Sequence, residues 1–356
     1  MSLKIIKDKL EDLKRIIPRE GSEQKPESRI GLDIGSSSIK LVEIHRSKDA
    51  LRIKKTISKD VGNRQIPSVI KELFSEYKKE SRQVSISLSG HGVVTRCIQM
   101  PKMPLPEVNQ ALSFEAEKYI PFSISEVILD CCILEKQPSE EKMLVLFAAA
   151  KKTMVDKKIQ QVKEAGLEIS LIDIDAIAFT NSFNQALAEV ANAHSKKGGS
   201  IALLNIGSSF CSLNILQGGL PRFMRDIFVG GKDISKRIGN MLGIGFEEAE
   251  KIKLNPKQHA EQTNEAAESI FSNLANEVRL SFDYYETQGN PPITALYLSG
   301  GGAYFDGTAD FFKQNLSIET ELWNPFTNLD ILPEVNRDEL DMQPGRFAIA
   351  TGLALR

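Results

Sequence analysis

The sequence predicts an α/β protein with two similar lobes, and three observations lead to this fold class. An apolar strand, a Gly-Ser turn and a second apolar strand occur at 31-GLDIGSSSIKLVEI-44. The same pattern returns at 203-LLNIGSSFCSL-213, and such an internal repeat is typical of duplicated structural units. A third strand, 296-LYLSGGG-302, ends in a run of glycines.

The composition narrows the class of protein before any motif is considered. The 356 residues suggest two or three domains, and 45 Lys and Arg against 47 Asp and Glu give a net charge of −2. This balance argues against nucleic acid as a partner, because nucleic-acid binders usually carry a basic excess. No apolar run approaches the roughly 20 residues that span a bilayer, and the N-terminus does not read as a secretory signal. We expect a cytoplasmic protein whose four cysteines are reduced thiols.

The chain from residue 1 to residue 90 begins with a separate N-terminal segment. Apolar residues recur in steps of three and four over 3–17, which predicts an amphipathic helix ended by Pro18, and 19–29 is a polar linker. The helix could dock on a partner, lie on a membrane surface or remain solvated. The first lobe then begins with strands at 30–34, 39–45 and 51–61, a helix at 66–80 and a strand at 83–90.

The middle of the chain predicts a small inserted subdomain. Its expected elements alternate as strand, helix, two strands and helix, an order typical of an α+β unit. They occupy 92–104, 106–122, 126–136, 142–151 and 153–166. A short strand leading into a helix follows at 167–191. The second lobe is expected at 200–216, 225–243, 246–254, 264–289 and 294–299, and the chain closes with a helix over 345–356.

The two Gly-Ser turns indicate anion binding. Glycine allows close backbone approach, and consecutive backbone N–H groups can converge on a phosphate. Asp33 ends the first strand, and a carboxylate beside phosphate oxygens requires a cation such as Mg²⁺ between them. Taken alone, such a turn is more often an ordinary hairpin. Two such hairpins from equivalent lobes, with a triglycine platform, predict a cleft that clamps a nucleotide. The motifs are neither a P-loop nor a Rossmann fingerprint.

These segments resemble the signature motifs of the actin, sugar-kinase and heat-shock-chaperone ATPase superfamily. The two phosphate motifs resemble 31–44 and 203–213, and the adenosine motif resembles 298-LSGGGAYFDG-307. The connecting motifs resemble 171-LIDIDAIAFTN-181 and 346-RFAIATGLAL-355. The resemblance implies ATP and Mg²⁺ as cofactors, with Asp33 placing the metal. The implied nucleotide-binding residues are Asp33, Gly35, Ser36, Ser37, Ser38, Lys40, Asn205, Gly207, Ser208, Ser209, Gly230, Gly231, Glu250, Lys253, Gly300, Gly301 and Gly302.

The insert resembles that of the FtsA branch, and the phrase 99-QMPKMPLPEVNQALSFEAEKYIPFSISEVILDCCIL-134 is similar to the PilM family of type IV pilus assembly proteins. The implied fold is a two-lobed actin-like ATPase with an FtsA-type α+β inserted subdomain. The implied domains are the N-terminal segment 1–29, a first lobe of 30–90, 167–195 and 345–356, a partner-binding insert 91–166, and a second lobe 196–344 with a helical subdomain 236–289.

The family resemblance implies a cytoplasmic ATP-binding scaffold, associated with the inner membrane through protein partners. It would capture the short cytoplasmic N-terminal tail of PilN, through an exposed edge strand or an apolar groove beside the insert. Other pilus inner-membrane and motor components and self-association are further expected partners. The insert residues Tyr119, Ile120, Pro121 and Phe122 are the predicted contacts, although such residues are more often core packing.

One departure from the superfamily pattern bears on turnover. Asn205 stands where the second phosphate motif usually has aspartate, and asparagine brings no negative charge to Mg²⁺. Asp173 is the predicted catalytic residue, with Asp175 as an alternative for holding the attacking water. We therefore expect ATP binding with slow or no hydrolysis. An active ATPase and an FtsA-like filament protein of cell division remain the alternatives.

Overall fold

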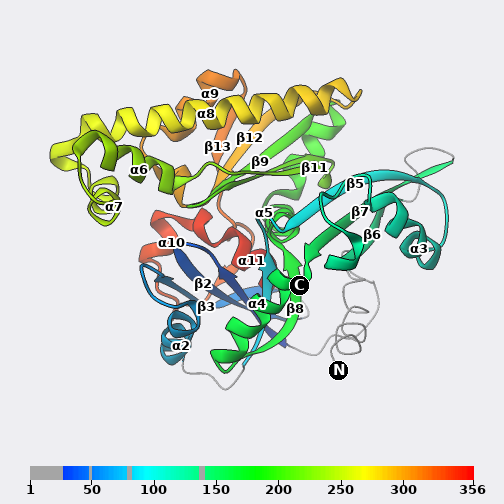
Figure 1. The fold of residues 1–356 in the computed structure, drawn as a ribbon, viewed down its shortest axis with the longest axis horizontal. Helices are drawn as coiled ribbons and strands as arrows, with labels where there is room; N and C mark the ends of the chain where they lie inside the picture. The colour runs from blue at the N-terminus through cyan, green and yellow to red at the C-terminus, as the bar shows by residue number, and fades with distance from the viewer. Residues whose placement is uncertain (1–26, 48–49, 78–81, 136–140) are drawn as a thin grey trace. The chain divides into compact units, whose positions relative to one another are not determined.

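The computed structural model describes residues 27–47, 50–77, 82–135 and 141–356 (Figure 1). The helix predicted over 3–17 lies outside these ranges. The chain divides into two compact units. The first comprises the chain up to Ala186 together with Phe326–Asp338 and Ile349–Arg356, and the second comprises Leu187–Pro325 and Glu339–Ala348. The long helix α5 (Asp175–Lys196) has a kink at Leu187, where the chain passes from one unit to the other.

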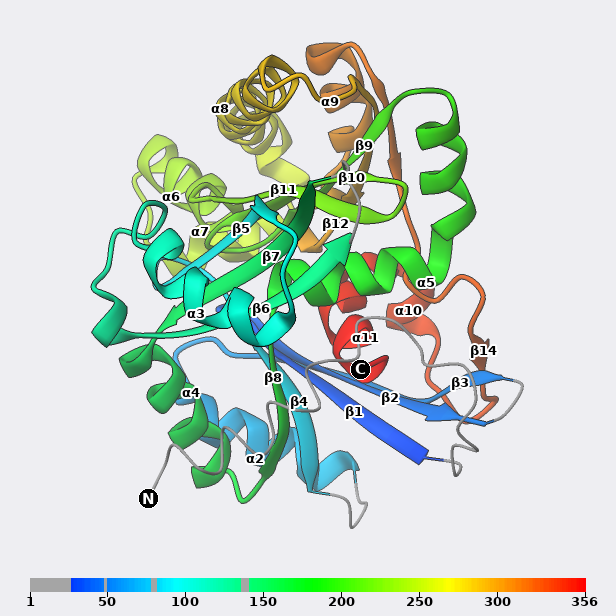
Figure 2. The same cartoon turned by 90° about the vertical axis from the view of Figure 1, so that its right-hand side faces the viewer.

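The first unit is built on a mixed sheet in the order β14-β3-β2-β1-β4-β8. β1 pairs antiparallel with β2 in the predicted hairpin, and β1, β4 and β8 run parallel. Apolar residues of α2 and α4 cover one face of this sheet, and Figure 2 shows both helices beside β4 and β8. The strands are β1 (Glu27–Ile34), β2 (Ser38–Arg46), β3 (Leu51–Asp60), β4 (Gln83–Leu88), β8 (Glu168–Ile174) and β14 (Asp330–Ile331), and the helices are α2 (Ile66–Tyr77), α4 (Lys152–Glu164) and α11 (Ala348–Ala354).

The predicted insert forms a separate antiparallel sheet within the first unit. Its order is β5-β7-β6, and α3 packs on it around Phe147. α3 ends at Ala116, so the prediction that this helix continues to Pro121 is wrong. The chain turns after Ala116 because Ile120, 8% exposed, packs into the core of the insert. The elements are β5 (Val93–Pro101), α3 (Leu105–Ala116), a 3₁₀ turn (Ile124–Glu126), β6 (Val127–Glu135) and β7 (Lys142–Lys151).

The second unit repeats the topology of the first. Its sheet has the order β11-β10-β9-β12-β13, with an antiparallel hairpin β9–β10 and a parallel pair β9–β12, which matches β3-β2-β1-β4-β8. The internal repeat predicted from the two Gly-Ser motifs is therefore confirmed. The long helix α8 covers one face of this sheet (Figure 1). The strands are β9 (Ser200–Ile206), β10 (Cys211–Gln217), β11 (Leu220–Ile227), β12 (Ile293–Ser299) and β13 (Glu319–Leu322).

Two of the helices in the second unit, α9 and α10, were not indicated by the sequence patterns. Residues between 308 and 342 form α9, β13, β14 and α10, and none of these short elements was predicted. The helices are α6 (Gly231–Leu242), α7 (Phe246–Leu254), α8 (Ala260–Thr287), α9 (Thr308–Leu316) and α10 (Asp338–Met342), with 3₁₀ turns at Lys257–His259, Gly301–Tyr304 and Pro344–Phe347.

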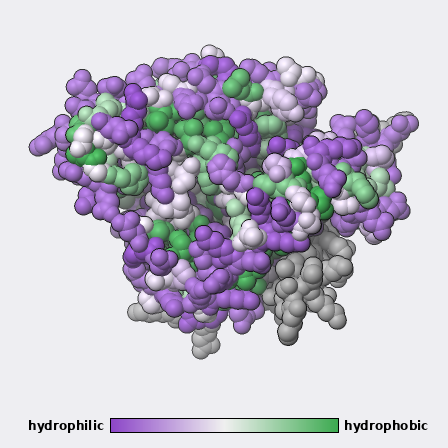
Figure 3. Space-filling model, viewed as in Figure 1, coloured by the Kyte–Doolittle hydropathy of each residue, from purple (hydrophilic) through white to green (hydrophobic). Residues whose placement is uncertain are grey.

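Hydrophilic residues cover most of the face drawn in Figure 3, and hydrophobic side chains appear there in smaller areas. The large apolar side chains that are exposed include Phe114 on α3, Phe246 and Leu254 on α7, and Leu280 and Tyr284 on α8. Single exposed apolar residues are normal on soluble proteins, so they do not by themselves mark a site.

Candidate functional site

The first hairpin brings Asp33 and Lys40 together. The two residues are direct partners in the β1–β2 ladder, and their side chains form an ion pair with an Nζ–Oδ2 distance of 3.2 Å. Gly35 is required in the turn because a Cβ there would lie 2.8 Å from the carbonyl oxygen of Ser38. The second hairpin has the same restriction, since a Cβ on Gly207 would lie 2.5 Å from the carbonyl oxygen of Phe210. The repeated glycine is thus a steric requirement of both turns.

A polar cluster surrounds the first hairpin, and we call it the carboxylate cluster: Asp33, Lys40, Ser87, Ser89, Lys158 and Asp175. Asp175 begins α5 directly after β8 and is buried. Burial and the neighbouring charge of Asp33 raise the pKa of Asp175 to about 7, although hydrogen bonds from Ser87 and Ser89 oppose the shift. Lys158 reaches the cluster from α4, and its Nζ donates a hydrogen bond to the carbonyl oxygen of Ile34 at 3.3 Å.

Lys158 is the second ammonium of this cluster, and burial lowers its pKa. The charges of Asp175 and Asp33 oppose that shift because they favour the ammonium form. The carboxylate cluster thus combines two carboxylates with two ammonium groups. Mg²⁺ is commonly held by one or two carboxylates together with phosphate oxygens and water, so Asp33 and Asp175 fit a nucleotide-bound Mg²⁺. No group of three or more His, Cys, Asp and Glu in the described ranges could hold a metal without such additional ligands.

The predicted nucleotide residues of the second unit lie close together. Gly231 donates its backbone N–H to the carbonyl oxygen of Gly207 at 3.0 Å, which joins the start of α6 to the β9–β10 turn. Lys253 Nζ donates to the carbonyl oxygen of Gly231 at 3.1 Å and forms an ion pair with Glu250 at 2.8 Å. Ser235 also donates a hydrogen bond to Glu250.

The glycine run after β12 completes this second group. Gly300 has a φ of +84°, and a Cβ there would lie 2.5 Å from the carbonyl oxygen of Ile206 and 2.7 Å from Oδ1 of Asn205. A Cβ on Gly302 would lie 2.4 Å from Cγ2 of Ile206, whereas one on Gly301 would meet only Cγ of Arg346, at 3.9 Å. The β9–β10 turn thus contacts the start of α6, and the end of β9 contacts the glycine run. The first backbone N–H groups of α6, those of Gly231, Lys232 and Asp233, donate to carbonyl oxygens of the chain, so the helix favours an anion here through its positive dipole.

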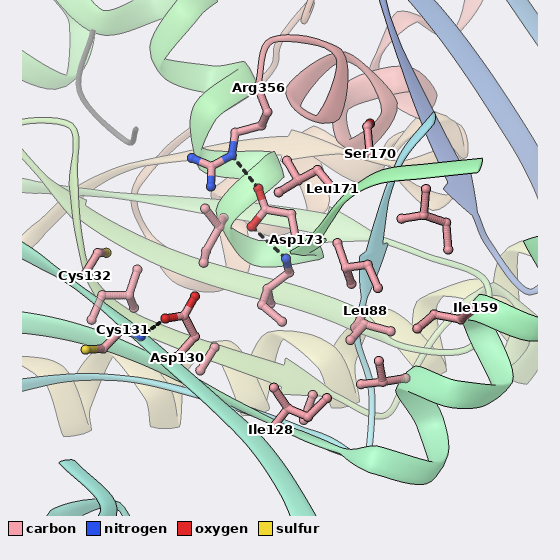
Figure 4. Close-up of a pocket in the computed structure, with 18 of the residues that line it drawn as sticks. Leu88, Ile128, Asp130, Cys131, Cys132, Ile159, Ser170, Leu171, Asp173 and Arg356 are labelled. Atoms are coloured by element: carbon pink, nitrogen blue, oxygen red, sulfur yellow. Dashed lines mark hydrogen bonds and ion pairs between the residues drawn. The ribbon is translucent and has the colours of Figure 1, made fainter. Parts of the chain in front are cut away.

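A groove of about 460 Å³ lies within the first unit, beside the insert (Figure 4). It is bordered by β8, the last strand of the large sheet, by β6, the last strand of the insert sheet, and by α4. Its lining is mostly apolar: Leu88, Ile128, Cys131, Cys132, Leu146, Ala148, Ala150, Val155, Ile159, Leu167, Ile169, Leu171, Ile172, Ile174 and Ile177, with Asp130, Lys163, Glu168, Ser170, Asp173 and Arg356 as its polar members.

The polar part of the groove contains a buried ion pair. Figure 4 shows Asp173 between Arg356, whose Nε is 2.9 Å from Oδ2, and the backbone N–H of Ile174. Burial raises the pKa of Asp173 more than Arg356 lowers it, and burial also raises the pKa of Asp130. Asp173 therefore lines the groove, whereas Asp175 lies beside Asp33. The catalytic role of Asp173 stays a prediction.

The predicted partner contacts of the insert do not line this groove. Tyr119 is 42% exposed and its ring lies near that of Phe147, Ile120 is buried in the insert core, and Pro121 is exposed. The ammonium of Lys151 lies 4.2 Å from the ring centroid of Phe122. Sequence reasoning missed the groove residues themselves. The nearest signal was the expectation of an edge strand or apolar groove beside the insert, and β6 is such an edge strand.

No helix of the described residues is both long and apolar enough to cross a membrane.

Comparison with known proteins gives matches over most of the chain. A solved PilM–PilN type IV pilus biogenesis complex contains a chain that is 30% identical, with a TM-score of 0.80 over 92% of this chain and 98% of that one. The ethanolamine utilization protein EutJ of Carboxydothermus hydrogenoformans has a similar fold, with 16% identity and a TM-score of 0.55 over 99% of this chain and 98% of that one.

A curated relative matches a smaller part of the chain. EutJ of Escherichia coli strain K12 is 27% identical over 156 residues, which are 44% of this chain and 48% of that protein, so the match spans about half of each. The family model described as type IV pilus assembly protein PilM matches residues 31–356. The α/β fold is the predicted actin-like ATPase fold. The chain therefore belongs to the PilM family of type IV pilus assembly proteins.

Proposed function

We propose that this type IV pilus assembly protein is an ATP-binding scaffold that captures the cytoplasmic N-terminal tail of PilN in the groove beside the insert. The groove between β6 and β8 carries the proposal. An edge strand can hydrogen-bond an extended peptide, and apolar pockets along it accept alternate side chains. The similarity to a protein solved in complex with PilN supports PilN as the source of the peptide. Attachment to PilN would hold the protein at the inner membrane.

A charge placed in the groove tests the capture of the tail. Leu171 lies on β8 and is only partly buried, so Leu171→Asp puts a carboxylate against the expected apolar side chains with limited cost to folding. We expect at least a tenfold loss of affinity for a fluorescent peptide that covers the tail of the cognate PilN. The control is Leu280→Asp on α8, where the side chain is 60% exposed and outside the groove. Equal affinities for all three proteins would contradict capture in this groove.

The nucleotide half of the proposal rests on the residues of both units. The carboxylate cluster offers Asp33 and Asp175 for Mg²⁺ and Lys40 for phosphate. In the second unit, the turn at Gly207, Ser208 and Ser209 and the positive end of the α6 dipole suit phosphate, and Glu250 and Lys253 suit the ribose or adenine. Asn205 adds no charge to the metal site, and binding without rapid turnover is the expected outcome.

Chromatography of the bound nucleotide tests the proposed binding of ATP without rapid hydrolysis. Purified protein is incubated for a day with ATP and Mg²⁺, and the retained nucleotide is then identified. Intact ATP is the expected result and corresponds to a structural or allosteric ligand. ADP would show turnover and add an ATPase cycle to the scaffold. A protein that retains neither nucleotide and takes none up would contradict the proposed cofactor.

A further inference from the structure

Helix α4 contacts both the groove and the carboxylate cluster. Val155, Ile159 and Lys163 of this helix line the groove. Lys158 comes from the same helix but is absent from the groove lining, and its Nζ donates to the carbonyl oxygen of Ile34 in the first hairpin. A helix moves as a rigid element, so a displacement of its groove-lining residues also moves Lys158.

The ends of β4 and β8 give a second connection between the two places. Leu88 and Ile174 line the groove, and each is followed directly in the chain by a residue of the carboxylate cluster. The residues that follow Leu88 and Ile174 are Ser89 and Asp175, and the Ser89 hydroxyl is hydrogen-bonded to the Asp175 carboxylate. The groove and the cluster are therefore separated by single peptide units, with the Lys158 ammonium interacting with both Asp33 and Asp175.

We propose that Lys158 is a positioning residue that transmits occupancy of the groove to the nucleotide site. Lys158 holds the end of β1 through Ile34 and neutralises part of the charge of the two aspartates. A peptide that moves α4 changes this contact, and hence the affinity of the cluster for a phosphate and its cation. The inference rests on the proposed function, since it needs both ligands to bind. By linkage, the nucleotide must change the peptide affinity by the same factor.

The test measures the coupling factor, which is the ratio of ATP affinities with and without saturating PilN tail peptide. It is determined by calorimetry for the wild-type chain and for Lys158→Met, with Lys157→Met as a matched control because Lys157 is the exposed neighbour on the same helix. We expect a wild-type factor of about five or more, a typical size for allosteric coupling. Lys158→Met should bring the factor to within twofold of one, while the peptide affinity without nucleotide stays within twofold of wild type.

Lys158→Arg separates a specific role from a structural one. Arginine keeps the positive charge and a donor for the carbonyl oxygen of Ile34. The logarithm of the coupling factor in Lys158→Arg should therefore be at least half of the wild-type value. Coupling that survives in Lys158→Met, or is lost equally in Lys157→Met, would overturn the proposal. So would a wild-type factor of one when both ligands bind. Failure of the proposed function is distinguishable, because wild-type protein would then bind no peptide or no ATP.

Discussion

Two opposing sets of interactions determine the pKa of Asp175 in the folded chain. Burial and the charge of Asp33 disfavour its carboxylate, whereas hydrogen bonds from Ser87 and Ser89 and the charge of Lys158 favour it. The first two effects are larger, because the pKa of Asp175 rises to about 7. A group near neutrality can take up or release a proton when a cation or a phosphate arrives, which is a useful property beside a nucleotide site.

The raised pKa of Asp175 should make the free energy of unfolding depend on pH. The unfolded chain loses the Asp175 proton at lower pH than the folded chain, so ionisation of Asp175 destabilises the fold progressively between about pH 4 and pH 7. Asp175→Asn removes that effect. Without nucleotide and Mg²⁺, the variant should gain roughly 2–4 kcal/mol in free energy of unfolding relative to wild type between pH 4 and pH 8. Urea unfolding across this range measures the gain, and a pH-independent difference would contradict the raised pKa.

The distinction between Asp173 and Asp175 shows how far residue-level prediction extends. Both lie in the segment 171-LIDIDAIAFTN-181, and the sequence indicated that one of them would hold a water. The choice depends on where β8 ends and α5 begins, and on Arg356, which lies far away in sequence and pairs with Asp173. Local patterns do not contain that information.

At the scale of elements, the backbone of α11 makes close contacts with its neighbours at two glycines. A Cβ on Gly352 would lie 1.8 Å from the carbonyl oxygen of Ala178 on α5, and one on Gly31 of β1 would lie 2.0 Å from the carbonyl oxygen of Ala350. Glycine at these two places lets α11 pack directly on β1 and α5. The small-residue composition of 345–356 predicted a helix, but its neighbours could not be inferred from the sequence.

A methyl group at Gly352 should therefore be costly. Gly352→Ala forces α11 and α5 apart, and we expect a loss of roughly 1–3 kcal/mol in free energy of unfolding. Gly245→Ala is the control, because Gly245 has a φ of −70° and no atom within 4 Å of an added Cβ. Thermal and urea unfolding of the two variants give the comparison. A loss at Gly352 no larger than that at Gly245 would show that the two helices adjust freely.

The elements that were predicted and those that were missed differ in a physical way. The hairpins and the long helices can be predicted from local sequence patterns: hairpins from the glycines of their turns, and helices from the spacing of apolar residues. The groove is assembled from β6, β7, α4, β8 and Arg356, so its shape depends on tertiary placement. The helices and strands between 308 and 342 are too short to show a periodic pattern of apolar residues.

At the scale of the whole molecule, ATP that binds the folded chain should stabilise it against unfolding. A ligand at a hundredfold excess over its Kd adds about 2.7 kcal/mol to the free energy of unfolding. We expect Asp33→Ala, in the first unit, and Lys253→Met, in the second, each to reduce the ATP-induced rise in Tm by more than half. Lys313→Met is the control, because Lys313 forms an exposed ion pair with Glu319 outside both groups.

Thermal unfolding with and without ATP and Mg²⁺ gives this comparison. An unchanged ATP effect in one of the two variants would restrict the nucleotide site to the other unit.

The course of the chain through the two units has a consequence for synthesis on the ribosome. The second unit has all its residues once Ala348 has been added, whereas the first still lacks Ile349–Arg356. Those residues contain most of α11, whose backbone lies against Gly31 of β1. β1 is synthesised before these residues and must keep this side uncovered until they have left the ribosome. The unit that begins first is therefore finished last, and a nascent chain stalled before Ile349 would expose β1 to chaperones and proteases.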